Sequence, residues 1–170
     1  MMSLSIRPAT LDDAPRIADI YNQGIAERGA TFETEPRTPE AIRVRLADAA
    51  QFPLLVAAAG DGVIGWAGLS SYRPRPCYAG IAEFSIYLDR AGRGRGVGRQ
   101  LLEALIEAAR ERGYWKLVSR VFPFNAASRA LCRACGFREV GIYEKHGRLD
   151  GRWTDVVIVE RLIQENLSEE

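Results

Sequence analysis

Arg93-Gly94-Arg95-Gly96-Val97-Gly98 is a glycine-rich turn between a strand-like run at 83–88 and a helix-like run that begins near Val97. Glycines let backbone N–H groups approach a ligand without a Cβ in the way. The start of a helix adds unpaired N–H donors and the positive end of the helix dipole. Arginines surround the turn at positions 90, 93, 95 and 99. The turn therefore predicts a binding site for an anion, and for a pyrophosphate in particular.

The spacing of the glycines excludes two common phosphate-binding motifs. Gly92, Gly94, Gly96 and Gly98 occur at every second position, so the third glycine of a dinucleotide fingerprint never has its required offset. A Walker A loop ends in Gly-Lys followed by Ser or Thr, and this turn does not. A flexible turn whose arginines are simply solvated remains the alternative to a phosphate site.

The hydrophobic pattern on both sides of the turn predicts a mixed α/β domain. Helical periodicity and capping residues predict helices near 11–28, 38–46, 97–113 and 125–136, with Gly29 and Gly113 ending the first and third. Apolar runs predict strands at 4–7, 54–59, 63–69, 80–88, 116–122, 137–143 and 153–162. Turns are expected at 60–62 and 149–152, and a loop at 70–80. Because three consecutive strands precede the glycine turn, a doubly wound nucleotide-binding fold is not expected.

The composition is typical of one globular domain. The chain has 170 residues, 47% of them hydrophobic and 26% charged, so we expect a single domain over 1–170 with its core at 4–163. A net charge of +1 gives no overall attraction to nucleic acid or a membrane, and neither is expected as a partner. No apolar run approaches the roughly 20 residues of a membrane span, and residues 1–7 do not resemble a signal peptide. Three cysteines, an odd number, favour a reducing compartment, so we expect a cytoplasmic protein.

Two motifs resemble those of the GCN5-related N-acetyltransferase (GNAT) superfamily. Its acetyl-coenzyme A signature, Q/R-x-x-G-x-G/A at a strand-to-helix turn, is matched by Arg93-Gly94-Arg95-Gly96-Val97-Gly98. Its downstream element, Asn-x-x-Ser-x-x-Leu and then Gly-Phe, is matched by Asn125, Ser128, Leu131 and Gly136-Phe137. The resemblance covers nearly the whole chain. It implies a mostly antiparallel, splayed sheet of about seven strands flanked by about four helices, with acetyl-CoA as cosubstrate and no metal.

Within the superfamily, the chain resembles most the phosphinothricin-type acetyltransferases, which include those acting on methionine sulfoximine and arsinothricin. The segments that carry this resemblance are 20–22, 30–36, 72–74, 83–87 and 151–156. It implies acetyl transfer to the α-amino group of a small amino-acid-like acceptor, and a homodimer. The family pattern Gly-x-x-His-Gly-x-Trp-His-Asp reads GRLDGRWTD at 147–155 here. Both histidines are missing, which weakens the case for phosphinothricin itself.

Two other functions remain open on the sequence. A protein or peptide N-terminal acetyltransferase would be favoured by a large acidic cleft, whereas a closed pocket around Arg73 would favour a small anionic acceptor. A protein that binds acetyl-CoA as a sensor, without turnover, would carry the same glycine turn. Release of the thiol with a panel of amines separates an enzyme from a sensor.

The resemblance places acetyl-CoA along the strand at 80–88 and the turn after it. Backbone groups of Ile86, Tyr87 and Leu88 would bind the pantetheine amides and polarise the thioester oxygen, with ordinary sheet pairing as the alternative. Backbone N–H groups from Gly94 to Arg99, those of Arg95, Gly96, Val97 and Gly98 included, would bind the pyrophosphate. The side chains of Arg93 and Arg95 would add charge.

The far side of the cosubstrate is expected to contact the short helix at 125–136. Asn125 and Ser128 are the residues that the resemblance assigns to this contact. Asn125 is also a typical N-cap residue, because its side-chain oxygen accepts a hydrogen bond from the first turn of a helix. We therefore expect Asn125 to have both roles.

Glu83 is the expected catalytic base. Acetyl transfer to an amine requires loss of a proton from the ammonium group and polarisation of the thioester. By the resemblance, Glu83 begins the strand beside the pantetheine arm, where a carboxylate would accept that proton directly or through a water. The alternative is a glutamate at a strand edge that forms only a salt bridge.

Five residues are expected to bind the acceptor beside Glu83. Arg73, with Arg75 close by, is the predicted contact for an acceptor carboxylate, because a guanidinium binds two oxygens at once. Phe32 and Tyr78 are expected to line the pocket, and Ser85 lies on the same strand as Glu83. The alternatives are a solvated arginine and aromatic rings that only cover the core.

The group that protonates the departing thiolate stays unassigned. Many members of the superfamily carry a Tyr four residues after the Ser, and this chain has Cys132 there. A free thiol titrates at roughly 8.5, so Cys132 is a weak acid at best, and we expect a buried, inert thiol. Cys132 and Cys135 spell C-x-x-C at the end of a helix rather than at its start. Cys77 and His146 add too few ligands for a metal site, so no redox or metal role is expected.

Overall fold

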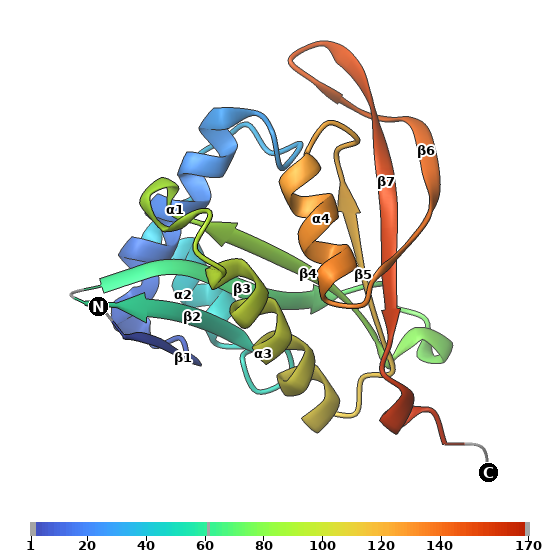
Figure 1. The fold of residues 1–170 in the computed structure, drawn as a ribbon, viewed down its shortest axis with the longest axis horizontal. Helices are drawn as coiled ribbons and strands as arrows, with labels where there is room; N and C mark the ends of the chain where they lie inside the picture. Colours follow the sequence, from blue (N-terminus) through green and yellow to red (C-terminus); the bar gives the residue numbers. More distant parts are fainter. Residues whose placement is uncertain (1–2, 61, 169–170) are drawn as a thin grey trace.

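The computed structural model describes residues 3–60 and 62–168 (Figure 1). Its strands are β1 (Leu4–Pro8), β2 (Leu54–Ala59), β3 (Gly62–Ser71), β4 (Ile81–Leu88), β5 (Lys116–Val121), β6 (Arg138–Leu149) and β7 (Arg152–Leu162). Its α-helices are α1 (Ala14–Glu27), α2 (Pro39–Leu46), α3 (Val97–Glu111) and α4 (Ala126–Ala134). Short 3₁₀ turns lie at Leu11–Asp13, Pro76–Tyr78, Arg90–Gly92 and Gln164–Asn166. The tip of the turn predicted at 60–62, the first two residues of the segment 1–7 and the two ends of the predicted 1–170 domain lie outside the described residues.

The strands form one sheet in the order β1-β2-β3-β4-β5-β7-β6. Each neighbouring pair is antiparallel except β4 and β5, which run parallel and are connected through α3. A parallel pair needs such a crossover, because both strands run in the same direction and the chain must return to the end where the first strand began. The prediction of a mixed α/β fold with a mostly antiparallel sheet is confirmed, and so is the order of its elements.

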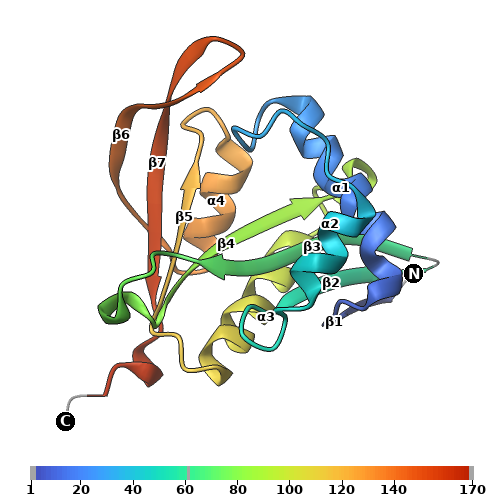
Figure 2. The same cartoon turned by 180° about the vertical axis from the view of Figure 1, so that it is seen from behind.

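The helices cover both faces of the sheet (Figures 1 and 2). Helices α1 and α2 lie on one face, where Ile17, Ile20 and Trp66 are fully buried. Helices α3 and α4 lie on the other face, where the apolar side of α3 packs on the sheet through residues such as Leu101 and Leu105. Each such side chain contributes roughly 1.5–3 kcal/mol by leaving water. Strand β4 lies between these two helical layers.

Two boundaries differ from those predicted. Helix α1 ends at Glu27, and Arg28 rather than Gly29 adopts the left-handed conformation, with φ 58°. Strand β6 continues to Leu149 instead of ending near 143, because it is an edge strand whose exposed side chains tolerate the polar stretch 144–148. The turn predicted at 149–152 is confirmed as a tight Asp150-Gly151 hairpin with φ 49° and 80°.

Candidate active site

The sheet splits between β4 and β5, and the split is the centre of the candidate site (Figure 1). The two strands are paired only at 81–83 and 116–118. Just past the last pair, the hydroxyl of Ser119 donates to the carbonyl of Phe84 at 3.0 Å. Beyond that point β4 remains paired with β3, and β5 remains paired with β7. The splayed sheet that the resemblance implied is therefore present, and its opening leaves one edge of β4 without a neighbouring strand.

The backbone N–H and C=O groups of successive β4 residues point alternately toward β3 and toward the split. The N–H of Asp89 donates to a β3 carbonyl at 2.8 Å, so the odd-numbered residues direct their backbone groups to β3. Even-numbered residues face the split, as the Phe84 carbonyl does. Of the three residues predicted to bind pantetheine through the backbone, Ile86 and Leu88 therefore face the split. Tyr87 does not, because its amide is on the β3 side, and only its side chain lines the opening.

The glycine turn leaves a run of backbone donors free at the start of α3. Gly94 and Gly96 have φ of 77° and 76°, in the left-handed region where a Cβ is strained. A Cβ at either position would meet nothing within 4 Å, so conformation and not space requires glycine there. Among the described residues, no N–H group at 94–99 donates a hydrogen bond to the protein. Together with the dipole of α3, these donors suit a diphosphate.

The arginines around the turn differ in what they contact. Arg93 forms a two-pronged ion pair with Glu27 of α1, at 2.9 and 3.0 Å. The hydrogen-bonded pair raises the pKa of Arg93 and lowers the pKa of Glu27. Arg93 thus links the turn to α1, and its guanidinium is not free as the sequence had suggested. Arg99 pairs with Glu103 at 3.0 Å, and Arg95 forms no ion pair within the part of the chain that the structure describes.

A groove of about 630 Å³ runs from the glycine turn along the start of α4. Asn125 begins this helix, and its side-chain oxygen accepts a hydrogen bond from the N–H of Ser128 at 3.1 Å. The predicted capping role of Asn125 is confirmed. Its amide nitrogen donates to the carbonyl of Gly29 at 3.1 Å, which links the loop after α1 to α4 across the groove. Ser128 lines the groove as well, and the contact of both residues with acetyl-CoA stays a prediction.

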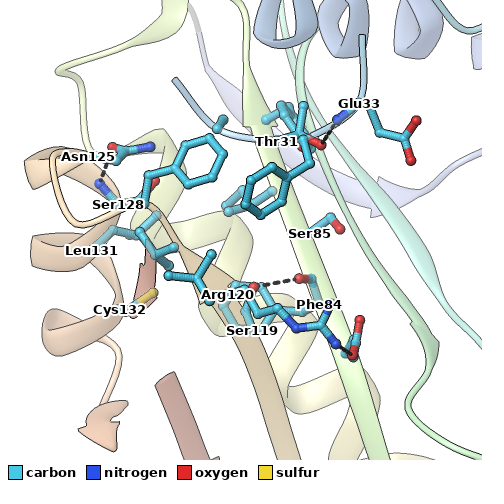
Figure 3. Close-up of a pocket in the computed structure, with 18 of the residues that line it drawn as sticks. Thr31, Glu33, Phe84, Ser85, Ser119, Arg120, Asn125, Ser128, Leu131 and Cys132 are labelled. Atoms are coloured by element: carbon cyan, nitrogen blue, oxygen red, sulfur yellow. Dashed lines mark hydrogen bonds and ion pairs between the residues drawn. The ribbon is translucent and has the colours of Figure 1, made fainter. Parts of the chain in front are cut away.

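A pocket of about 340 Å³ continues from this groove over β4. The groove and the pocket share a set of lining residues, namely Ala30, Ile86, Tyr87, Asn125, Ser128 and Leu131. Figure 3 shows Asn125, Ser128, Leu131 and Cys132 along α4 on one side, and Thr31 and Glu33 on the other. Three predicted acceptor residues, Phe32, Glu83 and Ser85, line this pocket. One continuous depression therefore joins the glycine turn to Glu83.

Glu83 lies at the last β4–β5 pair, where the pocket ends. Its carboxylate accepts a hydrogen bond from Arg120 at 2.8 Å, and its side chain is 27% exposed. The salt bridge that was the alternative to a base is thus present, in a position that also opens to the pocket.

Cys132 is buried against the pocket from the α4 side. Burial, with the neighbouring Cys135 as a smaller cause, raises the pKa of the Cys132 thiol to about 12. Such a thiol is a poor proton donor to a departing thiolate near neutral pH. The expectation of a buried thiol is confirmed, and the general acid stays unassigned.

Three predicted acceptor residues lie outside the pocket. Arg73 is stacked over the ring of Tyr72 at 5.2 Å, and Tyr78 packs against the same ring at 5.7 Å. Arg75 is exposed at the start of the 3₁₀ turn between β3 and β4. In the described chain, none of these three residues lines the pocket or the groove. The loop nevertheless leaves β3 only one residue after Ser70, the register partner of Glu83, so it is close to the site.

Several pocket residues are not apparent from the sequence. Tyr21 comes from α1, Ser119 and Arg120 from β5, and Thr31 and Glu33 from the loop after α1. The family resemblance covers Tyr21, Thr31 and Glu33 within the segments 20–22 and 30–36 but gives them no role, and no motif marks Ser119 or Arg120. The available signals are weak: Tyr21 interrupts the apolar face of a helix, and Arg120 interrupts an apolar strand.

Tyr87 is enclosed by other aromatic rings beside the pocket. Its ring lies 4.8 Å from Tyr21 and 5.2 Å from Trp66, and burial raises its pKa. A Cβ on Gly24 would lie 2.7 Å from the Tyr87 ring, so glycine is required for this close approach. Tyr87 therefore remains neutral and shapes one side of the pocket.

The described residues hold neither a metal-binding cluster nor a membrane-spanning helix. No group of three or more His, Cys, Asp or Glu side chains is arranged to bind a metal ion there. The same residues include no helix that is both long and apolar enough to cross a membrane. His146 packs on the ring of Tyr143 at 5.0 Å, on the exposed face of β6.

Known proteins share this sequence pattern and fold. A family model described as "Acetyltransferase (GNAT) domain" matches residues 3–138. An L-methionine sulfoximine/L-methionine sulfone acetyltransferase of Pseudomonas paraeruginosa is 38% identical over 94% of this chain and 94% of its own length.

Two solved structures are also similar over most of their length. A ribosomal-protein-alanine N-acetyltransferase from Brucella melitensis is 35% identical, with a TM-score of 0.89 over 94% of this chain and 99% of that one. A GNAT superfamily phosphinothricin acetyltransferase from Sinorhizobium meliloti, in complex with AcCoA, is 29% identical, with a TM-score of 0.90 over 99% of this chain and 93% of that one. The chain belongs to the GNAT acetyltransferase family.

Proposed function

We propose that this protein transfers the acetyl group of acetyl-CoA to the α-amino group of a small amino-acid-like acceptor. The observation that carries the proposal is the continuous depression from the free N–H groups at 94–99, past the open edge of β4, to Glu83. One end suits a diphosphate and the other end carries a carboxylate. An acyl donor and an amine would meet between these two ends.

The residues present fit acetyl-CoA. The amides at 94–99 would bind its diphosphate, with Arg95 adding charge. The backbone groups of Ile86 and the N–H of Leu88 would bind the pantetheine arm, because the split leaves them without a neighbouring strand. The Leu88 carbonyl already accepts hydrogen bonds from the Arg93 guanidinium at 3.2 and 3.3 Å. When bound, acetyl-CoA supplies the thioester that is attacked. A backbone N–H beside that thioester stabilises the oxygen that becomes negative during the attack.

Glu83 would take the proton that the acceptor ammonium group must lose. Its carboxylate lies in the pocket, and its hydrogen bond to Arg120 fixes its position. An amine is a nucleophile only after it has lost that proton, so the base must lie beside the bound acceptor. Ser85, two residues further along the same face of β4, lies between Glu83 and Tyr87.

The acceptor class follows from the relatives and from the size of the pocket. Two of the named relatives act on methionine sulfoximine, methionine sulfone or phosphinothricin, which are all small amino acids. A pocket of about 340 Å³ suits an acceptor of that size. Because neither motif histidine is present at 147–155, we place methionine sulfoximine before phosphinothricin.

A second candidate is acetylation of a protein N-terminus, which the likeness to a ribosomal-protein-alanine N-acetyltransferase favours. A panel assay of thiol release from acetyl-CoA tests both candidates. It would include methionine sulfoximine, phosphinothricin, arsinothricin and a peptide with an N-terminal alanine. Turnover confined to the free amino acids supports the first proposal, turnover of the peptide alone supports the second, and acetyl-CoA binding without any turnover indicates a sensor.

We also propose a cytoplasmic homodimer. The three cysteines are all free, as expected in a reducing compartment. Strand β6 is an edge strand with exposed apolar side chains, among them Val140 and Ile142, and Trp153 of β7 is 59% exposed beside it. Such an edge is normally covered or paired. Light scattering after gel filtration would give twice the chain mass for a dimer.

A further inference from the structure

Arg45 on α2 is a partly buried arginine without an acidic partner. Its guanidinium lies 5.1 Å from the centre of the Trp66 ring and donates one hydrogen bond, of 3.3 Å, to the carbonyl of Leu69. Within residues 3–60 and 62–168 it forms no salt bridge. Burial lowers the pKa of its guanidinium. A partly desolvated charge without a counter-charge costs free energy in the unliganded protein. Its chemistry is complementary to an anion.

The guanidinium lies over β3, the strand next to β4, whose side chains line the acceptor pocket. A Cβ built on Gly68 would be 3.0 Å from the Arg45 Nη2 atom. Gly68 is the register partner of Ser85, and the next pair on the same face is Ser70 with Glu83. Neighbouring strands are roughly 4.8 Å apart. Arg45 is therefore one strand away from Ser85 and close to the proposed base.

A hollow of about 430 Å³ opens beside Arg45. Tyr21 lines both this hollow and the acceptor pocket, so the two adjoin. Arg37 also lines it, but this guanidinium is paired with Glu33 at 3.0 Å. Asp48, whose N–H donates to the Arg45 carbonyl at 3.1 Å, also lines it, but its side chain forms no salt bridge with Arg45 in the described chain. Arg45 is thus the cation that remains available to a ligand in this hollow.

We propose that Arg45 binds the α-carboxylate of the acceptor and selects for free α-amino acids. The inference rests on the proposed acetyl transfer. A guanidinium binds both oxygens of a carboxylate at once. In an α-amino acid the carboxylate and the amine share one carbon, so a carboxylate held over Gly68 directs the amine toward Ser85 and Glu83. The role first predicted for Arg73 is then performed by an arginine of another element.

The test compares an acceptor acid with its amide. Arg45→Met keeps an unbranched stem over Trp66 and removes the charge. We expect the KM for methionine sulfoximine to rise about tenfold or more, as for loss of a charged hydrogen bond, with kcat little changed. The wild-type preference for the acid over its carboxamide should disappear. Arg43→Met, at a half-buried position on the same helix where the arginine is paired with Glu40, is the matched control and should behave as wild type.

An unchanged preference in Arg45→Met would overturn the proposal, provided that calorimetry shows normal acetyl-CoA binding. An effect seen with phosphinothricin but not with methionine sulfoximine would also overturn it, because the side-chain anion and not the α-carboxylate would then be bound. If Arg45→Met does not fold, Arg45→Lys replaces it, with a smaller rise in KM expected and an unchanged KM counting against the proposal.

Failure of the proposed acetyl transfer can be distinguished from failure of the role proposed for Arg45. If the wild type acetylates no amino acid, the proposed function fails, and calorimetry with the free acid and its amide still decides the role of Arg45. Binding of the acid that is lost in Arg45→Met supports the site. Equal binding by wild type and variant overturns it.

Discussion

The cosubstrate half and the acceptor half of the site are built in different ways. The cosubstrate half uses backbone groups from two adjacent segments, the open edge of β4 and the turn at 93–99. The acceptor half uses side chains from α1, the loop after it, β4 and β5. A backbone site depends on a few conformations, whereas a side-chain site depends on the packing of the whole fold. Substitutions in the first half should therefore change acetyl-CoA affinity, and those in the second half should change turnover or acceptor choice.

The largest effect is expected at Glu83. Glu83→Gln keeps the size of the side chain and removes its ability to take a proton, so kcat should fall by about 10²-fold or more. Acetyl-CoA affinity, measured by calorimetry, should stay the same because the diphosphate site is remote. Glu40→Gln, at an exposed position on α2, is the control. Unchanged turnover in Glu83→Gln would remove this residue as the base.

At the glycine turn we expect the opposite pattern, a change in acetyl-CoA affinity with little change in kcat. Gly96→Ala places a Cβ at φ 76°, which costs roughly 1–2 kcal/mol. If that strain moves the N–H groups at 94–99, acetyl-CoA should bind about 5- to 30-fold more weakly, with kcat at saturation little changed. Gly141→Ala is the matched control, since its φ is ordinary and its Cβ would meet nothing within 4 Å. A fall in kcat alone would contradict the division between the two halves.

A substitution at Asp89, shortly before the glycine turn, tests whether this residue stabilises the fold rather than taking part in acetyl transfer. It accepts hydrogen bonds from Gln23, Ala91 and Arg16, which lower its pKa to about 2 from 3.8. A depressed pKa stabilises the fold above the unfolded value of 3.8, and the contribution is lost as the pH falls toward 2. Asp89→Asn should therefore lower the free energy of unfolding by roughly 2 kcal/mol at pH 7.

Urea unfolding at several pH values measures this contribution. The difference between Asp89→Asn and wild type should be constant from pH 7 to about pH 5 and narrow below pH 4. Asp19→Asn, at an exposed position on α1, is the control. A difference that does not depend on pH would show that the carboxylate charge is not the cause.

The smallest effect is expected at Cys132. Its thiol has a pKa of about 12 and does not titrate near neutrality. Cys132→Ala should leave the pH profile of kcat unchanged between about pH 6 and 9, with only a loss of thermal stability from the buried cavity. A lost limb in that profile would assign the missing general acid to Cys132.

The two halves also differ in how far the sequence predicts them. The turn is local: Gly94 and Gly96 have the required φ, and the helix follows at Val97 as its pattern predicts. Asn125 as a helix cap is likewise a short-range feature. The acceptor half is not local. Arg120 pairs with a residue 37 positions away, and Arg73, the residue that a motif suggested, is stacked on Tyr72 outside the pocket.

The same distinction explains the boundaries that were not predicted. Strand β6 extends through a polar stretch because β7 supplies its hydrogen bonds, which no local pattern shows. The orientation of the Tyr87 amide depends on which strand pairs with β4, so only the sheet register reveals it. Helix and turn chemistry can be derived from neighbours in the chain, but pairing and side-chain convergence require the tertiary fold.

The short β4–β5 pairing has a consequence beyond the site. Among the residues that the structure describes, only the segments 81–83 and 116–118 join the β1–β4 half of the sheet to the β5–β7 half by a ladder. Amide hydrogens along this seam should exchange with solvent sooner than those in the interior of either half, because opening it disturbs few hydrogen bonds. A molecule inserted in the split would contact both halves and slow that exchange. The gap that admits the ligand thus makes the ligand a structural part of the sheet.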